Sequence, residues 1–533
     1  MARGTVLFAL LAAGLAAAVY VNALNNPFVF DDRSEILENP SIRSLANPLV
    51  VLRHSLTRPV TNLSYAIDFA SWGEDPFGYH LTNLVLHVAN VLLLFAWLRR
   101  VTLDRTPSLP PVHGMLAAFA GAALFAVHPL MTEAVGYVSG RAEVLCATWF
   151  LAGAYCLYRS FALRGRAAVG LQVAGVAFFL LALGTKELGV MLPAVVLACD
   201  LLLVRRAGTD WRARFWRIHA PLMLVVLALG LARVWFYVAV EHPTAAGLDW
   251  RHVLVNLHVV QRYLALLVVP VSQSIVPAVY PFESLFDSRL LAAIAVVGGV
   301  LAWAIHARNH EPLITFGIVW FFLALLPSAA LILLADRGQP MAEHRVYLAS
   351  CGFFMVCAAG VSRVLRAERD HARRRFTMVA AGLSMVLLIL GALTIARNRV
   401  WSDPVLLWQD AAREAPRTWA AHYGLADALH EADECESAEA SYRRAIALRP
   451  DHANGYLGAA DCLANLERPA AARELLRQAI ARVPADVRPR LALATLEERV
   501  FGRPEEALRL CREALSMAPN HPEAQRCIVR NSR

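Results

Sequence analysis

Charged residues are scarce in this sequence of 533 residues. They make up 17% of it, whereas hydrophobic residues make up 58% and the mean hydropathy is +0.47. Because a soluble protein usually has about 25% charged residues, this composition excludes a simple water-soluble globule and indicates a chain that lies partly in a bilayer. The long apolar runs lie almost entirely before residue 397, and the sequence after residue 410 is polar and rich in alanine. A membrane body followed by a water-exposed tail is therefore expected.

Several common binding motifs are absent as well. The chain has neither GxGxxG nor GxxxxGKS/T, so nothing indicates a soluble nucleotide ligand. Its nine cysteines include no CxxC pair and no Cys/His spacing typical of a metal site, and the sequence leaves open whether any cysteines of the tail are bonded. No cofactor is expected, and no obligatory metal ion is expected either, although an Asp-Asp pair is compatible with one.

Lysine is almost absent, since Lys186 is the single lysine among 51 basic residues. The arginines lie mainly in short segments between apolar runs, which is typical of topology signals. The net charge of +9 therefore does not indicate a nucleic-acid partner. A lone lysine next to a span boundary is instead a candidate for anion binding.

Eleven apolar runs are long enough to cross a bilayer, which takes about 20 helical residues. They cover residues 5–24, 81–98, 115–131, 137–157, 167–184, 187–204, 219–240, 289–306, 312–334, 346–365 and 377–396. Pro327 is expected to kink or end the helix of its run. The segment 253–270 carries four polar side chains and is interpreted as re-entrant or interfacial. An alternative for residues 1–23 is a cleaved signal peptide.

Arginine-rich segments follow every second boundary between these runs. They are Arg99 and Arg100; Arg159, Arg164 and Arg166; Arg205, Arg206, Arg212, Arg214 and Arg217; Arg308; and Arg363, Arg366, Arg369, Arg373, Arg374 and Arg375. Loops rich in arginine and lysine face the cytoplasm. The N-terminus is therefore predicted to be cytoplasmic, with the first loop, residues 25–80, and the tail on the outer side.

The tail contains internal repeats. Pro450, Pro484 and Pro519 are 34 and 35 residues apart, and small residues keep nearly the same spacing. These small residues are Ala426 and Ala460; Ala438, Ala472 and Ala507; and Ala445, Ala479 and Ala514. This is the tetratricopeptide pattern, in which two helices of each repeat approach closely. Three repeats are expected over residues 417–533, after a bridge and capping helix at 398–416. Their concave groove would bind a protein partner, a spacer or dimerisation surface being the alternative.

Four polar clusters lie at predicted outer boundaries, where charged groups are costly unless they have a role. They contain Asp31 and Asp32 with Glu35; His128, Glu133, Tyr137, Ser139, Arg141 and Glu143; Lys186 and Glu187; and Glu343, His344 and Arg345. Carboxylates beside cations suit the deprotonation of an acceptor and the binding of a lipid-linked phosphate. A solvated acidic turn, a structural hydrogen-bond network and a neutralising ion pair are the structural alternatives.

Taken in order, these segments resemble the transmembrane and tetratricopeptide-repeat (TMTC-type) O-mannosyltransferases and their bacterial relatives, in the GT-C class of glycosyltransferases. The resemblance rests on NPFVFDD at 26–32, RPVTNLS at 58–64, DPFGYHLTN at 75–83, HPLMTEAV at 128–135, SGRAE at 139–143, TKE at 185–187, AEHR at 342–345 and RNRVW at 397–401. It covers nearly the whole chain. It implies an all-α fold, in which a GT-C-like membrane helix bundle over residues 1–397 precedes a tetratricopeptide-repeat α-solenoid.

The resemblance also implies a function. The donor would be a polyprenyl-phosphate sugar, with mannose as an extrapolation, and the acceptor a hydroxyl on a protein or glycan. The family's acidic pair corresponds to Asp31 and Asp32, one of which would be the general base of an inverting transfer. The leaving phosphate would be held by Lys186, Arg141, Arg345, His128 and Arg58, and the supporting polar network would contain Glu133, Glu187, Glu343 and His344. The protein would lie in a bacterial inner membrane, with its site and repeats on the periplasmic face.

Two other function classes stay open. A non-enzymatic membrane scaffold, whose repeats dock an envelope protein, predicts that both aspartates can be replaced freely. A transporter or flippase requires charged residues near the midplane of the spans, and such residues are scarce. Among enzymes, ligation or polymerisation of a lipid-linked glycan is a further alternative.

Overall fold

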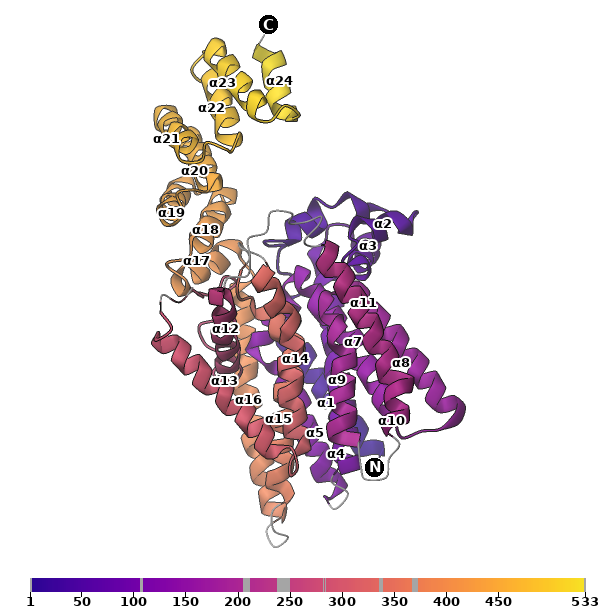
Figure 1. Cartoon of the computed structure of the whole chain (residues 1–533). Coiled ribbons are helices and arrows are strands. Elements are labelled where there is room, and N and C mark those ends of the chain that lie inside the picture. The colour runs from indigo at the N-terminus through magenta and orange to yellow at the C-terminus, as the bar shows by residue number, and fades with distance from the viewer. Residues whose placement is uncertain are drawn as a thin grey trace. The chain divides into compact units, whose positions relative to one another are not determined.

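The computed structural model describes residues 2–105, 109–204, 211–236, 250–280, 282, 284–334, 339–366 and 372–531, and no strand occurs within these ranges. The chain forms two compact units, residues 1–273 with 279–402, and residues 274–278 with 403–533 (Figure 1). The first unit contains the long apolar helices, and the second contains the repeats. The predicted all-α class is confirmed.

The membrane unit is a bundle of long helices. Its principal members are α1 (Ala2–Tyr20), α4 (Pro76–Arg105), α5 (Pro111–Val127), α7 (Arg141–Ser160), α8 (Gly165–Thr185), α9 (Leu192–Cys199), α11 (Ala220–Phe236), α12 (Trp250–Val268), α13 (Ser288–Ala307), α14 (Pro312–Leu334), α15 (Tyr347–Arg366) and α16 (Ala372–Val400). Within the described residues, nine helical stretches are long and apolar enough to cross a membrane, or ten if one bent pair counts as a span. The predicted span 137–157 corresponds to α7, which is not among them. Residues 237–240 of the predicted span 219–240 lie outside the described ranges.

Prolines explain two features of the bundle. His128 precedes Pro129 and takes an extended conformation (φ −78°, ψ 127°), as a residue before proline prefers, so α5 ends at Val127. The chain resumes helical turns over Pro129–Gly136 at an angle of 55° to α5. By contrast, α14 continues past Pro327 to Leu334, so this proline does not end its helix.

The ambiguous segment 253–270 forms most of α12, which is one continuous helix. Its described apolar part covers Leu254–Val268. The re-entrant or interfacial interpretation of this segment stays a prediction.

The first loop is folded and lies at one end of the bundle (Figure 1). It contains two short helical turns, η2 (Arg33–Leu37) and η3 (Pro40–Arg43), and the helices α2 (Pro48–His54) and α3 (Pro59–Trp72). The buried Asn62 joins these pieces, because its side-chain amide donates to the Val51 carbonyl at 2.7 Å and accepts from Asn39 at 3.0 Å. Ile36, Ile42, Val51 and Tyr65 form a small apolar core beneath them.

The repeat unit starts with α17 (Pro404–Glu414). The helix pairs α18 (Trp419–Glu431) and α19 (Cys435–Leu448), α20 (Ala453–Asn465) and α21 (Pro469–Arg482), and α22 (Arg488–Arg499) and α23 (Pro504–Met517) follow, and α24 (Pro522–Asn531) is last. Every alanine on which the repeat prediction rested is at most 5% exposed, so the helices of each pair pack closely as expected. A disulfide joins Cys511 to Cys527.

The third repeat has one residue more than the second, and the structure locates it. The turn between α22 and α23 has four residues, whereas the turns between α18 and α19 and between α20 and α21 have three. The longer turn contains Gly502 with φ +64°, a conformation that favours glycine. The insertion therefore lengthens a turn and leaves the helix register intact.

Candidate functional site

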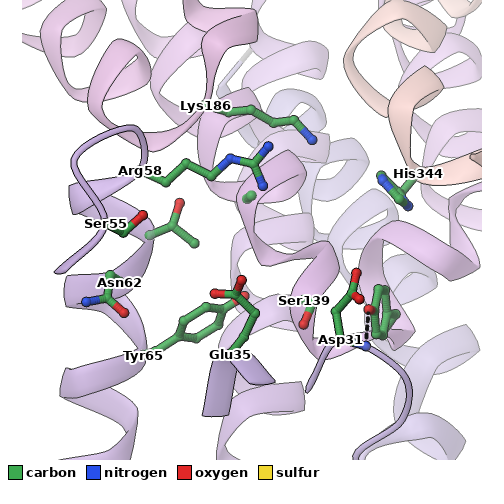
Figure 2. A pocket seen from close by; sticks show the side chains of 12 residues that line it. Asp31, Glu35, Ser55, Arg58, Asn62, Tyr65, Ser139, Lys186 and His344 are labelled. Carbon is green, nitrogen blue, oxygen red and sulfur yellow. Dashed lines mark hydrogen bonds between the residues drawn. The ribbon is translucent and has the colours of Figure 1, made fainter. Parts of the chain in front are cut away.

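A pocket of about 100 Å³ lies between the first loop and the adjoining ends of the bundle helices (Figure 2). It is lined by Asp31, Glu35, Ser55, Arg58, Thr61, Asn62, Tyr65, Tyr137, Ser139, Ala142, Lys186 and His344. Four residues predicted from the sequence as site residues, Asp31, Arg58, Lys186 and His344, are thus brought together from segments far apart in the chain. Figure 2 shows the cations Arg58 and Lys186 on one side of the pocket and the carboxylates of Asp31 and Glu35 on the other.

The adjacent aspartates have different environments. Asp31 lines the pocket, and its backbone N–H donates to the Tyr137 hydroxyl at 3.0 Å. Asp32 is fully buried. One of its carboxylate oxygens accepts from the Ser139 N–H at 2.8 Å and the Ser139 hydroxyl at 2.6 Å, and the other accepts from the Val29 N–H at 3.1 Å. Only Asp31 is available to a bound molecule, and Asp32 fixes the loop to the turn at Ser139.

The backbone directly before Asp31 is strained. Phe30 has φ +53°, in the left-handed region that bulky residues rarely adopt, at a cost of about 1–3 kcal/mol. Such a conformation persists only where neighbouring contacts hold it. The hydrogen bonds of the Asp31 N–H and of the Asp32 carboxylate supply those contacts on its C-terminal side.

Burial dominates the acidity of the carboxyl groups in this region. It raises the pKa of Asp31 above its usual value, although the Tyr137 hydrogen bond and the charges of His344 and Arg58 oppose the increase. Burial also raises the pKa of Glu35, and it raises the pKa of Asp32 to about 7. A carboxylate with a raised pKa is a stronger proton acceptor than an ordinary aspartate.

Both cations of the pocket have acidic neighbours. Lys186 Nζ lies 2.5 Å from Glu143 Oε1, and Arg58 Nη2 lies 3.4 Å from both carboxylate oxygens of Glu187. Burial alone would lower the pKa of Arg58, but the surrounding carboxylates, Glu187 foremost, outweigh it and raise the pKa. The Arg58 side chain therefore stays cationic. The contacts of Arg58 are long, so its N–H groups can turn toward another anion at little cost.

His344 is held by a buried carboxylate. Its Nδ1 lies 2.7 Å from Glu133 Oε1, and its backbone N–H donates to Glu133 Oε2 at 3.1 Å. Glu133 is 3% exposed and does not line the pocket. Its two hydrogen bonds to His344 fix the direction of the imidazole, and the imidazole lines the pocket.

Arg141, His128 and Arg345 lie outside this pocket. Arg141 is fully buried, and its Nη1 lies 2.6 Å from Asp68 Oδ2. It also donates to Asn83 and to the Tyr79 carbonyl, so it joins α3 and α4 to the start of α7.

The other two basic side chains bond to backbone carbonyls. His128 Nε2 lies 3.1 Å from the Leu267 carbonyl. Arg345 donates to the Gln339 carbonyl at 2.9 Å and lines a separate cavity next to Tyr263. Glu343, predicted as part of the supporting network, accepts from Gln273 at 2.9 Å and is likewise not a pocket residue.

Several pocket residues were not predicted as site residues. Glu35, Tyr137 and Ser139 lie within the polar clusters noted in the sequence, and Thr61 and Asn62 lie within the segment RPVTNLS. The sequence signal for these residues was that they are polar and lie within segments already singled out. What the sequence did not show was that the first loop folds back over the turn at residues 137–142.

Comparison with known proteins gives two kinds of match. The tetratricopeptide-repeat family matches residues 405–453, 431–487 and 457–522. Protein O-mannosyl-transferase F38B6.6 of Caenorhabditis elegans is 23% identical and covers 83% of this chain. Protein O-mannosyl-transferase Tmtc3 of Drosophila melanogaster is 24% identical over 95% of the chain, and human TMTC3 is 25% identical over 96%.

The chain spans less than two thirds of the length of these relatives, since the matches cover 63% of the worm and fly proteins and 61% of the human one. Among solved structures, the Arabidopsis OM64 TPR domain is 22% identical with a TM-score of 0.20, and the match covers 21% of this chain and 93% of that domain. The resemblance expected from the motifs is confirmed: homologues over most of this chain are TMTC-type protein O-mannosyl-transferases, and its C-terminal part consists of tetratricopeptide repeats.

Proposed function

We propose that the chain is a membrane glycosyltransferase of the GT-C class, which moves a sugar from a polyprenyl-phosphate donor to a hydroxyl group of a protein acceptor. The observation that carries this proposal is the pocket, in which the Asp31 carboxylate faces two cations across a small cavity. The names of the relatives support mannose as the sugar. The repeats would present the acceptor or a protein partner.

Asp31 is the proposed general base. Its carboxylate takes the proton of the acceptor hydroxyl while the hydroxyl oxygen forms a bond to the anomeric carbon. The bond from that carbon to the phosphate oxygen breaks at the same time, and the phosphate leaves with the electron pair. Because the carboxylate and the cations lie on different sides of the pocket, nucleophile and leaving group would occupy opposite faces of the sugar, which is the geometry of an inverting transfer.

Arg58 and Lys186 are the proposed partners of the leaving phosphate. Its negative charge grows as the bond breaks, and fixed cations stabilise it strongly where water is largely excluded. Lys186 is 7% exposed and therefore lies in such an environment. His344, held by Glu133, supplies a further polar contact at the edge of the same cavity.

The direction of the helices supports an outer-face site. The pocket residues Ala142, Lys186 and His344 lie at one end of α7, α8 and α15. Arg159, Arg166 and Arg366 lie at the other ends of the same helices, about 30 Å away at 1.5 Å per residue. Since arginine-rich loops stay in the cytoplasm, the pocket would face outward, where a lipid-linked donor presents its head group. Arg205, Arg206 and Arg369, on which the orientation also rested, lie outside the described residues.

A transfer assay tests this proposal. The purified chain is given radiolabelled polyprenyl-phosphate mannose and a detergent extract of envelope proteins, beside the variants Asp31→Asn and Asp32→Asn. Transfer by the wild type that is lost in a folded, donor-binding Asp31→Asn variant supports the proposal. Transfer that persists in Asp31→Asn refutes its role as base. If no donor in a series of lipid-linked sugars binds, the scaffold alternative is favoured.

A further inference from the structure

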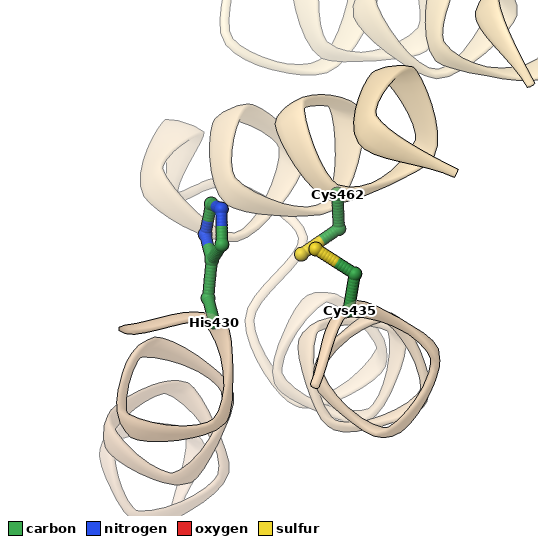
Figure 3. A group of neighbouring side chains, drawn as sticks. All are labelled: His430, Cys435 and Cys462. Carbon is green, nitrogen blue, oxygen red and sulfur yellow. The ribbon is translucent and has the colours of Figure 1, made fainter. Parts of the chain in front are cut away.

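Three metal-ligating side chains from three consecutive helices meet in the repeat unit (Figure 3). His430 lies near the end of α18, Cys435 is the first residue of α19, and Cys462 lies in α20. Their potential ligand atoms all lie within 4.8 Å of one another. We propose that His430, Cys435 and Cys462 form a zinc site that joins the first two repeats.

The three side chains can hold a zinc ion after a small adjustment, with a water molecule as the fourth ligand. Zinc binds cysteine sulfur at about 2.3 Å and histidine nitrogen at about 2.0–2.1 Å, so two ligands of a tetrahedral ion lie about 3.5–3.8 Å apart. Small rotations of the half-buried His430 imidazole and of the two buried thiols about their side-chain bonds close the remaining distance. Two thiolates and one imidazole favour zinc over magnesium or calcium, which prefer oxygen ligands.

The surroundings resemble those of bound thiolates. Cys462 is fully buried and Cys435 is 8% exposed, so water competes little for the ion. The Asn465 side-chain amide lies 3.9 Å from Cys435 Sγ and donates to it, and the N-terminus of α19 adds a partial positive charge near the same sulfur. Asp461 Oδ2 lies 3.3 Å from His430 Nε2 and orients the ring. Hydrogen bonds of this kind to the ligand side chains fix their orientation and tune the affinity for the metal.

A metal ion would give the two free cysteines, Cys435 and Cys462, a shared binding partner. Neither Cys435 nor Cys462 is disulfide-bonded, and both are buried. Zinc binds cysteine as the thiolate, so binding would release the thiol protons and hold both sulfurs at the ion.

The site has a structural consequence for the array. It links both helices of the first repeat to the first helix of the second, so it fixes the angle between those repeats. Repeats contact mainly their neighbours, and the angle between them sets the curvature of the concave groove. The disulfide between Cys511 and Cys527 joins α23 to α24 in the same unit. The repeat array thereby has a cross-link toward each of its ends.

Metal content of the full chain tests the site. The detergent-purified protein is reduced, incubated with Zn²⁺, passed through a desalting column and measured for zinc. We expect one ion per chain in the wild type and loss of it in Cys435→Ser and Cys462→Ser. Cys156→Ser, which changes a cysteine of the membrane unit, is the matched control and should keep the ion. Asn465→Leu should weaken zinc affinity about 10- to 100-fold, because the Cys435 sulfur loses its hydrogen-bond donor.

Two measurements on the unchanged sequence avoid the question of whether a variant folds. Substitution with Co²⁺ should give thiolate-to-cobalt charge transfer and the strong visible bands of a tetrahedral site. In protein that has not been reduced, Zn²⁺ should protect Cys435 and Cys462 from alkylation, while Cys511 and Cys527 remain disulfide-bonded. Absence of a retained ion in the wild type would overturn the proposal, as would a Cys435–Cys462 disulfide in the non-reduced peptide map of the protein as isolated.

Discussion

At the residue scale, the two adjacent aspartates divide two tasks between them. Asp31 reaches the pocket, and Asp32 holds the strained turn through three hydrogen bonds. The resemblance found in the sequence implied that one of the two aspartates would be the general base. It could not tell which one, because the choice depends on the left-handed Phe30 and on contacts with Ser139, more than 100 residues away.

Asp32→Asn should destabilise the protein. The amide nitrogen introduced on one side would face either the Val29 or the Ser139 N–H, so two donors would meet and a buried group would lose its partner. The expected loss is about 1–3 kcal/mol of unfolding free energy. Thermal unfolding in detergent measures it, with Asp31→Asn as the matched control. Equal melting temperatures for both variants would contradict the structural role of Asp32.

Transfer activity should fall as the pH is lowered through the pKa of Asp31. A general base must be ionised, and burial raises this pKa above the about 3.9 of an ordinary aspartate. The acid limb of kcat/KM should therefore lie above that value and disappear from the residual activity of Asp31→Asn. The measurement is kcat/KM across the acid range, with donor affinity followed at each pH as a control. A limb that persists in the variant belongs to another group.

Arg141 was predicted to bind the donor phosphate, but it lies outside the pocket in a buried ion pair. Its cationic side chain beside a polar hairpin suggested phosphate binding, yet its partner Asp68 comes from the first loop and buries it completely. A pairing across 73 positions leaves no periodic or local signal. Lys186 and Arg58 also have acidic neighbours, but both line the cavity.

At the element scale, apolar runs and prolines in the sequence predicted the positions of most helices. The bend after α5 agrees with His128-Pro129, and the repeat helices agree with the 34-residue period. The folded first loop could not be predicted, because α2 and α3 are short and depend on contacts such as those of Asn62. Helix α7 begins with Arg141 and Glu143, which form ion pairs inside the protein. These charges lower the mean hydropathy of the helix, so it is not among the stretches apolar enough to cross a membrane.

Close packing of α14 on α15 should depend on Gly352. A Cβ there would collide with the Gly317 carbonyl oxygen, whereas nothing lies within 4 Å of a Cβ on Gly360 of the same helix. Gly352→Ala should cost about 1–3 kcal/mol by overpacking. Gly360→Ala should be neutral or gain about 0.5–1 kcal/mol, because alanine is the better helix former. Melting temperatures of the two variants in detergent check this, and equal values would contradict the packing.

At the scale of the whole molecule, the orientation of the bundle is open to a direct test. Ser55 lines the pocket, and Arg166 lies exposed at the start of α8. Ser55→Cys should react with an impermeant maleimide in intact cells, and Arg166→Cys only after permeabilisation. The wild-type chain gives the background from its own cysteines. The reverse pattern would place the pocket in the cytoplasm and remove the outer-face donor from the proposal.

The central claim is that Asp31 acts on the acceptor while Arg58 and Lys186 hold the donor. Its most direct test measures kcat/KM for transfer and the dissociation constant of the polyprenyl-phosphate sugar in the same preparations. Asp31→Asn should lower kcat/KM about 10²- to 10⁴-fold, as for loss of a general base, and leave donor affinity unchanged. Arg58→Gln should weaken donor binding. Unchanged transfer in Asp31→Asn, or a loss explained entirely by weaker donor binding, would contradict the assignment.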